Sequence, residues 1–183
     1  MKTKFIVASF LLTLAFVSCK NEEKKESVTP AVEEVKVNTF DVTVDVVLKT
    51  DDDLILYYKD GTNEWFVEEK AVWNTVKGNN EVQSVVFNLP EGVLPNDLRL
   101  DIGRNEFKGL KDIEIKKITI SYLGNKFEIQ QDQLETFFKP NQFISYDAAT
   151  KLYSFKKDEQ GNYDPFFETK PEFYPQLAKI SSK

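Results

Sequence analysis

The chain has no histidine and only one cysteine among its 183 residues. Catalytic sites of the Ser-His-Asp and Cys-His kinds and metal sites built on histidine are therefore excluded. The single cysteine, Cys19, also makes an internal disulfide impossible. No phosphate-binding or dinucleotide-binding glycine motif is present. A pair of carboxylates, as used in glycoside hydrolysis, is still permitted, but we expect a protein that is not an enzyme and needs no cofactor.

The N-terminal apolar run is too short to span a bilayer, which takes about 20 residues. It covers residues 5–17, is interrupted only by Ser9 and Thr13, and follows two lysines. A short basic segment followed by an apolar segment of this kind is typical of an export signal. We therefore expect residues 1–18 to be a signal peptide that is removed and takes no part in the fold.

The lone cysteine lies directly after this run. Residues 16–19, Phe-Val-Ser-Cys, resemble the lipobox of bacterial lipoproteins, with Phe16 where leucine is more common. In that family the cysteine becomes the acylated first residue of the mature protein. The resemblance implies that Cys19 carries acyl chains such as palmitate, which anchor the protein to the outer membrane. A leftover free thiol is the alternative.

Residues 19–37 are expected to be the lipidated cysteine and a flexible linker, because they are rich in charge and contain no aromatic residue. Residues 20–23, Lys-Asn-Glu-Glu, are similar to the surface-export signals of Bacteroidota lipoproteins, which implies display on the cell surface. A spacer facing the periplasm is the alternative. Asp and Glu number 30 against 24 Lys and Arg, and this acidic balance disfavours nucleic acid as a partner.

From residue 39 onward, apolar residues alternate with polar ones. This period predicts strands at 40–48, 54–58, 82–89, 98–102 and 113–123, with weaker candidates at 63–67 and 71–76. Short strands separated by turns are typical of an antiparallel β-sandwich, with a small closed barrel as the alternative. We therefore expect residues 38–183 to form one all-β domain.

One strand and the turn after it can be interpreted in more detail. Within residues 113–123 the apolar phase slips at residues 116–117, which indicates a β-bulge. Residues 124–125, Gly-Asn, then predict a two-residue hairpin loop. That loop would set Ile120 opposite Ile129, so that apolar residues meet on one face.

One short helix is expected in the C-terminal part. Asp132 and Glu135 form a capping pattern before apolar residues at helical spacing, and Pro140 ends the pattern. A second hairpin is expected over residues 143–155. The segment from Gly161 onward is rich in proline and phenylalanine, and we expect it to run extended along the core surface without a helix.

Several short motifs resemble jelly-roll domains. Residues 98–105, followed by residues 113–120, look like a pair of strands that recurs in them, with Ile102 where proline is frequent. Residues 85–90 and 163–165 look like further parts of the same pattern. Such domains resemble carbohydrate-binding modules and occur beside bacterial cell-surface glycan enzymes. The resemblance implies a β-sandwich that binds glycan.

The aromatic residues around one turn indicate where a glycan would bind. An exposed ring can stack on a sugar while amides and carboxylates bond its hydroxyl groups. Adjacent tyrosines on a strand point to opposite faces, so one of Tyr57 and Tyr58 should be exposed. A place in the core is the alternative for each ring. The predicted glycan site consists of Tyr57, Tyr58, Asp60, Asn63, Glu64, Trp65 and Trp73.

Three further carboxylates form a candidate structural calcium site, because Ca²⁺ takes oxygen ligands. Asp97 and Asp101 flank one predicted strand, and Asp164 lies in the C-terminal segment. The acidic run at residues 51–53 is interpreted instead as a solvated break between strands. We expect a non-catalytic cell-envelope lipoprotein that binds glycan. The alternative is a structural or accessory envelope protein with a protein partner, which an exposed apolar patch or an open strand edge would favour.

Overall fold

The computed structural model describes residues 38–104 and 112–182. These described residues all belong to one compact unit. The predictions of a signal peptide at residues 1–18, a lipidated Cys19 and a linker at 19–37 concern residues outside the described ranges. They stay predictions. In the described part of the chain, no helix is both long enough and apolar enough to cross a membrane.

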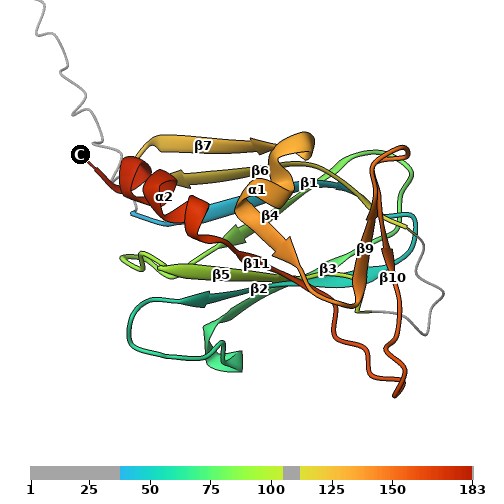
Figure 1. The fold of residues 1–183 in the computed structure, drawn as a ribbon. Helices are drawn as coiled ribbons and strands as arrows, with labels where there is room; N and C mark the ends of the chain where they lie inside the picture. The colour runs from blue at the N-terminus through green and yellow to red at the C-terminus, as the bar shows by residue number, and fades with distance from the viewer. Residues whose placement is uncertain (1–37, 105–111, 183) are drawn as a thin grey trace, which may run out of the picture. The chain divides into compact units, whose positions relative to one another are not determined.

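The fold is the predicted all-β sandwich of antiparallel sheets (Figure 1). The first sheet has the order β4-β1-β6-β7 and consists of β1 (Asp41–Val47), β4 (Gln83–Asn88), β6 (Glu114–Tyr122) and β7 (Asn125–Gln130). The second has the order β3-β2-β5-β11-β8 and consists of β2 (Asp52–Lys59), β3 (Ala71–Val76), β5 (Asp97–Asp101), β8 (Phe138–Pro140) and β11 (Phe166–Thr169). The predicted second hairpin is confirmed as β9 (Ile144–Asp147) and β10 (Leu152–Phe155).

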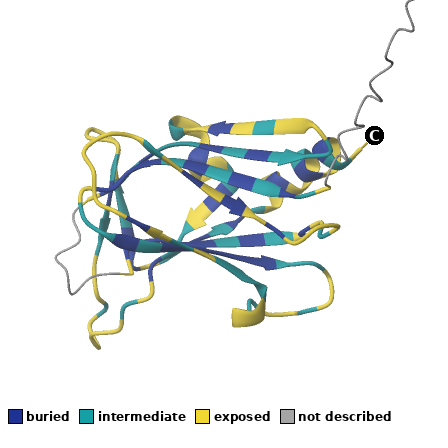
Figure 2. Ribbon diagram, turned by 180° about the vertical axis from the view of Figure 1, so that it is seen from behind, coloured by how far each residue is buried: buried dark blue, intermediate teal, exposed yellow. Residues whose placement is uncertain are grey.

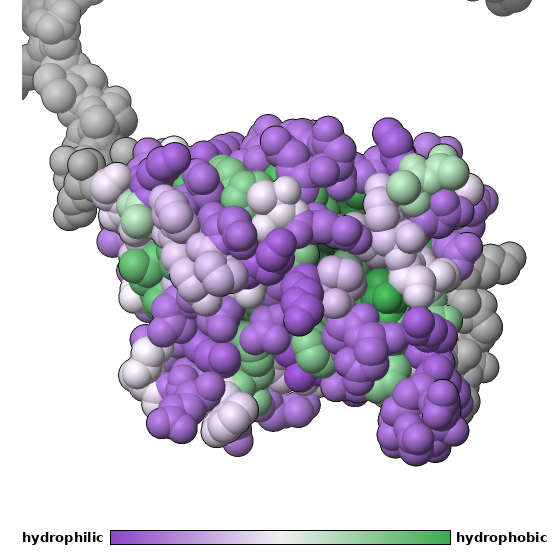
Figure 3. Space-filling view, viewed as in Figure 1, coloured by the Kyte–Doolittle hydropathy of each residue, from purple (hydrophilic) through white to green (hydrophobic). Residues whose placement is uncertain are grey.

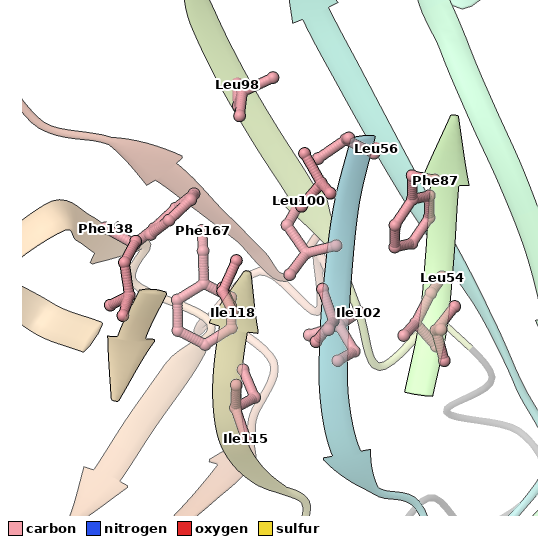
Figure 4. Close-up of a cluster of buried hydrophobic side chains, with 14 of the residues drawn as sticks. Leu54, Leu56, Phe87, Leu98, Leu100, Ile102, Ile115, Ile118, Phe138 and Phe167 are labelled. Atoms are coloured by element: carbon pink, nitrogen blue, oxygen red, sulfur yellow. The ribbon is translucent and has the colours of Figure 1, made fainter. Parts of the chain in front are cut away.

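The core lies between the two sheets, because each strand turns alternate residues toward the opposite sheet. Buried and more exposed residues accordingly alternate along the strands (Figure 2). Val42 and Val44 from β1 and Leu54 and Leu56 from β2 are all at most 1% exposed. Figure 4 shows how side chains from both sheets meet in this layer. Burying each such side chain contributes roughly 1.5–3 kcal/mol to folding.

The predicted bulge in β6 is confirmed. Asp45 of β1 pairs with Lys117, whereas its neighbour Val46 pairs with Ile115, so Lys116 is the extra residue. The extra residue restores the inward phase, and the strand contributes buried side chains on both sides of the bulge. Among the weaker strand candidates, residues 71–76 form β3, whereas residues 63–67 form no strand.

The predicted register of the β6–β7 hairpin is wrong by two residues. Tyr122 pairs with Asn125, and Ile129 lies opposite Ile118 instead of Ile120. The two loop residues are Leu123 and Gly124, with φ angles of 53° and 83°. Positive φ at both positions is what a type I′ turn requires. A shift of two residues keeps every side chain on its predicted face, so the apolar pattern alone could not separate the two registers.

The predicted helix is shorter than expected. It consists of a 3₁₀ turn, Gln131–Gln133, and a single α-helical turn, α1 (Leu134–Phe137). Gln130 donates its backbone N–H to the side-chain oxygen of Gln133 at 3.2 Å, so this pair closes the first turn instead of the predicted acidic pair. The next residue, Phe138, already belongs to β8 and is buried in the core.

The prediction of an extended C-terminal segment without a helix is wrong. The segment supplies β11, which pairs with β5 on one side and β8 on the other. A 3₁₀ turn, Pro171–Phe173, and a second helix, α2 (Tyr174–Ser181), follow. Pro175 is tolerated because it stands in the first helical turn, where its missing N–H costs no hydrogen bond. The fold therefore has two short helices where one was expected.

The acidic run at residues 51–53 is not a solvated break, because Asp52 begins β2 and is fully buried. Its carboxylate accepts the backbone N–H of Gly103 at 2.6 Å. The carbonyl of Gly103 accepts the hydroxyl of Tyr163. These two bonds tie the end of β5 to the start of β2 and to the segment before β11.

We predict that alanine at position 103 destabilises the protein much more than alanine at position 92. Both glycines have positive φ, +86° and +79°, which costs a residue with a Cβ about 1–2 kcal/mol. At Gly103 the added Cβ would also lie 2.7 Å from a ring carbon of Phe155, whereas nothing lies within 4 Å at Gly92. We expect Gly92→Ala to lower the free energy of unfolding by about 1 kcal/mol and Gly103→Ala by about 3 kcal/mol.

Urea unfolding of the two variants would measure this difference. Equal losses would mean that Phe155 moves aside freely and that the close approach is unimportant.

Candidate functional site

The predicted glycan site centres on the loop between β2 and β3, which Lys70 holds closed. Its ammonium group lies 2.5 Å from Asp60 Oδ1 and 3.1 Å from Asn63 Oδ1, and it also contacts the Thr62 hydroxyl. The hydrogen bond from Lys70 and those from the Thr62 hydroxyl and N–H lower the pKa of Asp60 to about 2. Asp60 is therefore ionised at neutral pH, and its partners belong to the loop itself.

Asn63 also acts within the loop. Its side-chain NH₂ donates to the carbonyl of Trp65 at 2.7 Å, while its oxygen accepts from Lys70. Asp60 and Asn63 therefore fix the backbone that carries Glu64 and Trp65. The Trp65 side chain is 76% exposed, more than any other large apolar residue in the described part of the chain. The loop presents this ring to solvent without using it for packing.

The two tyrosines are both buried, so the prediction that one is exposed is wrong. Tyr58 is 6% exposed and belongs to the core between the sheets. Tyr57 points to the opposite face, but it is only 8% exposed. Arg99 pairs with it from β5, and the guanidinium carbon lies 5.4 Å from the centre of its ring. Long side chains on the outer face of the sheet thus cover a residue that strand geometry turns away from the core.

Trp73 lies on that same outer face. It is opposite Ile55 in the β2–β3 pair and is 47% exposed. The guanidinium carbon of Arg104 lies 5.2 Å from the centre of its ring. With Tyr58 inside the core and Trp73 under Arg104 on the outer face, the structure does not bring the seven predicted residues into one site.

Two of the seven residues, Asn63 and Glu64, do line a cleft. Its volume is about 560 Å³. The other lining residues come from the facing ends of β2 and β5 and from helix α2. They are Lys59, Asn96, Asp97, Tyr174 and Leu177. The cleft thus joins the loop that the sequence singled out to a helix that it did not predict.

The cleft combines an aromatic ring with polar groups that are free to bind. Tyr174 is 44% exposed, and burial, together with the charges of Asp97 and Glu168, raises the pKa of its hydroxyl. The hydroxyl is therefore protonated at neutral pH and able to donate. Among the described residues, neither the amide of Asn96 nor the carboxylate of Glu64 has a side-chain partner. This set can stack on a ring and bond hydroxyl groups.

Lys59, the cation of the cleft, already has partners. Its ammonium group lies 3.3 Å from Asp97 Oδ2 and 4.3 Å from the centre of the Phe66 ring. The other Asp97 oxygen accepts the hydroxyl of Thr169 and, at 3.1 Å, the N–H of Leu98. Lys59 and Asp97 therefore hold the strand ends together and form a wall of the cleft.

Sequence reasoning missed the contribution of Tyr174 and Leu177. The signal was present, because Phe173, Leu177 and Ile180 have the i, i+4, i+7 spacing of one helix face. All three are buried. The prolines nearby led to the prediction of an extended segment, although proline is common in the first turn of a helix.

The three carboxylates of the predicted calcium site do not converge. Asp97 pairs with Lys59, whereas Asp101 and Asp164 both pair with Arg99. The guanidinium group stands between the two carboxylates, where a cation would have to bind. In the part of the chain that the structure describes, no group of three or more acidic or cysteine side chains could hold a metal ion.

Asp101 is the most unusual of these carboxylates, because it is only 1% exposed although it lies on the outer face of the sheet. Arg99 binds both of its oxygens, at 2.7 and 2.8 Å. Burial nevertheless raises the pKa of Asp101 to about 6, since loss of hydration outweighs the opposing effect of Arg99. Asp164 adds to the rise because it brings a second negative charge to the same guanidinium group.

Comparison with known proteins gave no match to any family model, curated protein or solved structure.

We predict that Asp101 makes folding less favourable as the pH rises from about 4 to about 6. Its pKa is higher in the folded protein than the usual 3.8, so the folded state holds the proton over this range while the unfolded state loses it. A difference of about two pKa units between the folded and the unfolded state lowers the free energy of unfolding by about 3 kcal/mol as an upper limit. Asp101→Asn should remove this loss, and the variant should gain stability relative to the unmodified protein between pH 4 and pH 7.

Chemical unfolding of both proteins across this pH range would test the sign. If the unmodified protein instead becomes more stable than Asp101→Asn as the pH rises, Arg99, and not burial, dominates the pKa of Asp101.

Proposed function

We propose that this protein is a non-catalytic lipoprotein of the cell envelope that binds glycan in the cleft between the β2–β3 loop and α2. One observation carries the proposal. The exposed ring of Tyr174 lines the same cleft as Asn96 and Glu64, whose polar groups have no side-chain partner among the described residues.

The chemistry of sugars fits this arrangement. A sugar ring has an apolar C–H face that packs on an aromatic ring, and a rim of hydroxyl groups that both donate and accept hydrogen bonds. Tyr174 and the apolar side chain of Leu177 suit the C–H face of the sugar, and Asn96 and Glu64 suit its hydroxyl groups. Trp65, next to Glu64 in a loop fixed by Lys70, offers a second exposed ring. The likeness of the strand motifs to jelly-roll carbohydrate-binding modules supports the same class of ligand.

The absence of catalysis is part of the proposal. Glycoside hydrolysis uses two carboxylates, one of which must exchange a proton with the bond being broken. The cleft has two, but Asp97 is bound by Lys59, Thr169 and the N–H of Leu98. That leaves Glu64, and a single free carboxylate suits binding better than hydrolysis.

The alternative, an envelope protein that binds a protein partner, receives less support, because the edges of the two large sheets carry groups that hinder strand addition. At the β3 and β4 edges, Asn74 donates its side-chain amide to the Val86 carbonyl at 3.1 Å. At the edge formed by β8, Pro140 has no N–H to offer an incoming strand. The β7 edge carries Lys126 and Glu128, and charged residues discourage strand addition.

The face of the molecule shown in Figure 3 also gives the alternative little support. On the face shown in Figure 3, polar residues predominate and apolar residues show only as small separate areas. Large docking surfaces for proteins usually expose a continuous apolar patch.

The anchor completes the proposal. Acyl chains on Cys19 would hold the domain at the outer membrane, and residues 19–37 would let it reach glycans at the cell surface or, on the other face, in the periplasm. The support is the sequence pattern of residues 16–23 and the net charge of −6, which suits an uncharged ligand better than a polyanion.

We predict that Tyr174→Ala and Trp65→Ala each weaken glycan binding at least tenfold, whereas Trp73→Ala leaves it unchanged. Binding to the unmodified protein should be weak, on the order of millimolar to micromolar, because an open polar site recovers little of the cost of association. A glycan array followed by calorimetry on the purified protein would measure it. Trp73 is the matched control, since it is a half-exposed tryptophan outside the cleft.

The melting temperatures should stay nearly unchanged, because Trp65 and Tyr174 are 76% and 44% exposed. Loss of binding in Trp73→Ala alone would move the site to the outer face of the sheet. Binding that survives both Tyr174→Ala in the cleft and Trp65→Ala in the loop beside it would remove the cleft from consideration.

We predict that Cys19→Ser abolishes labelling by a palmitate analogue in cells and leaves a precursor that retains residues 1–18. The reason is that the thiol is the only group to which the diacylglycerol can be attached. Metabolic labelling and mass measurement of the N-terminus would check this. Undiminished labelling of the variant would contradict the lipoprotein assignment.

A further inference from the structure

We propose that Glu64 makes the cleft selective for the charge of its ligand, so that it binds neutral and amino-bearing glycans and rejects acidic ones. This inference rests on the proposed function and specifies its ligand class. It follows from the charges that line the cleft and from which of them are already paired.

The lining carries one positive and two negative side chains, those of Lys59, Glu64 and Asp97. Lys59 is 3.3 Å from Asp97, and these two charges offset each other. Glu64 has no ion-pair partner among the described residues and is exposed. The cleft therefore presents one uncompensated negative charge to its ligand.

The cation in the same loop as Glu64 also has partners of its own. Lys70 is paired with Asp60 at 2.5 Å and bonded to Asn63, the residue next to Glu64. On the other side of the cleft, Glu168 is a further negative charge that acts on the Tyr174 hydroxyl. The surroundings thus reinforce the negative charge, and so does the net charge of the chain, −6.

A carboxylate on a sugar would have to approach this charge. Two like charges about 4 Å apart repel each other in water, and they repel more strongly near a protein surface. The penalty in affinity should be roughly tenfold, which corresponds to about 1.4 kcal/mol. A sugar with an ammonium group at the same place should bind more tightly by a comparable factor. The affinity of a neutral sugar should be unaffected by this charge.

The test uses sets of oligosaccharides that share a sugar backbone and differ in whether one substituent is neutral, cationic or anionic. Gluco-, galacto- and manno-oligosaccharides would each be presented to the purified protein in neutral, amino-sugar and uronic-acid form. We expect the uronic-acid form to bind roughly tenfold more weakly than the neutral form of the same oligosaccharide, and the amino form at least as tightly. Higher salt should shrink these differences, since exposed charges are screened.

Two variants separate a local effect of Glu64 from the net charge of the protein. Glu64→Lys should reverse the preference in favour of the uronic-acid forms. Glu159→Lys makes the same change of charge at an exposed position outside the cleft, and it should preserve the original order of affinities.

The outcomes are distinguishable. If neither the unmodified protein nor any variant binds any of the oligosaccharides, both the glycan-binding function and this inference are overturned. If binding occurs but neutral and uronic-acid forms bind equally, or if Glu64→Lys and Glu159→Lys behave alike, the glycan-binding function stands and the role of Glu64 is overturned.

Discussion

The contact between the inner faces of the two sheets is the interaction on which the rest of this structure depends. Phe40 and the inward residues of β1 meet those of β2 and β5, and nearly all of them are completely buried. Because pleating turns alternate residues to opposite sides, this one apolar layer also decides what faces outward. The same packing places the β2–β3 loop, the aromatic residues Tyr57 and Trp73 on the outer face, and the strand ends that border the cleft.

The cleft is a product of chain topology. Its loop follows β2 and its aromatic ring belongs to α2, more than a hundred residues later in the sequence. They meet because β11 inserts between β5 and β8 and so delivers the start of α2 to the end of the second sheet. The loop side is held rigid by Lys70 and its three oxygen partners, so a ligand would find the position of Glu64 largely preset.

The acidic residues serve different ends according to their surroundings. Asp52 and Asp101 are buried, and each has a fixed partner: a backbone N–H binds Asp52, and Arg99 binds Asp101. Asp60 is exposed to solvent in part but fully engaged by its own loop. Glu64 stands apart as the carboxylate of the cleft without such a tie. Of the two carboxylates in the cleft, Asp97 is paired with Lys59, whereas Glu64 has no ion-pair partner among the described residues.

The sequence by itself determined the fold class, most of the strands and the bulge at Lys116, because a period of two along a strand is a local property that burial enforces. It did not determine the β6–β7 register, since Leu123 and Gly124 give a loop with the same apolar face as the predicted one. Whether Tyr57, Tyr58 and Trp65 are covered or exposed was decided only in the tertiary structure, because exposure depends on neighbours such as Arg99 from a different strand. The cleft was decided there too, since it exists only where α2 packs beside a loop distant in sequence.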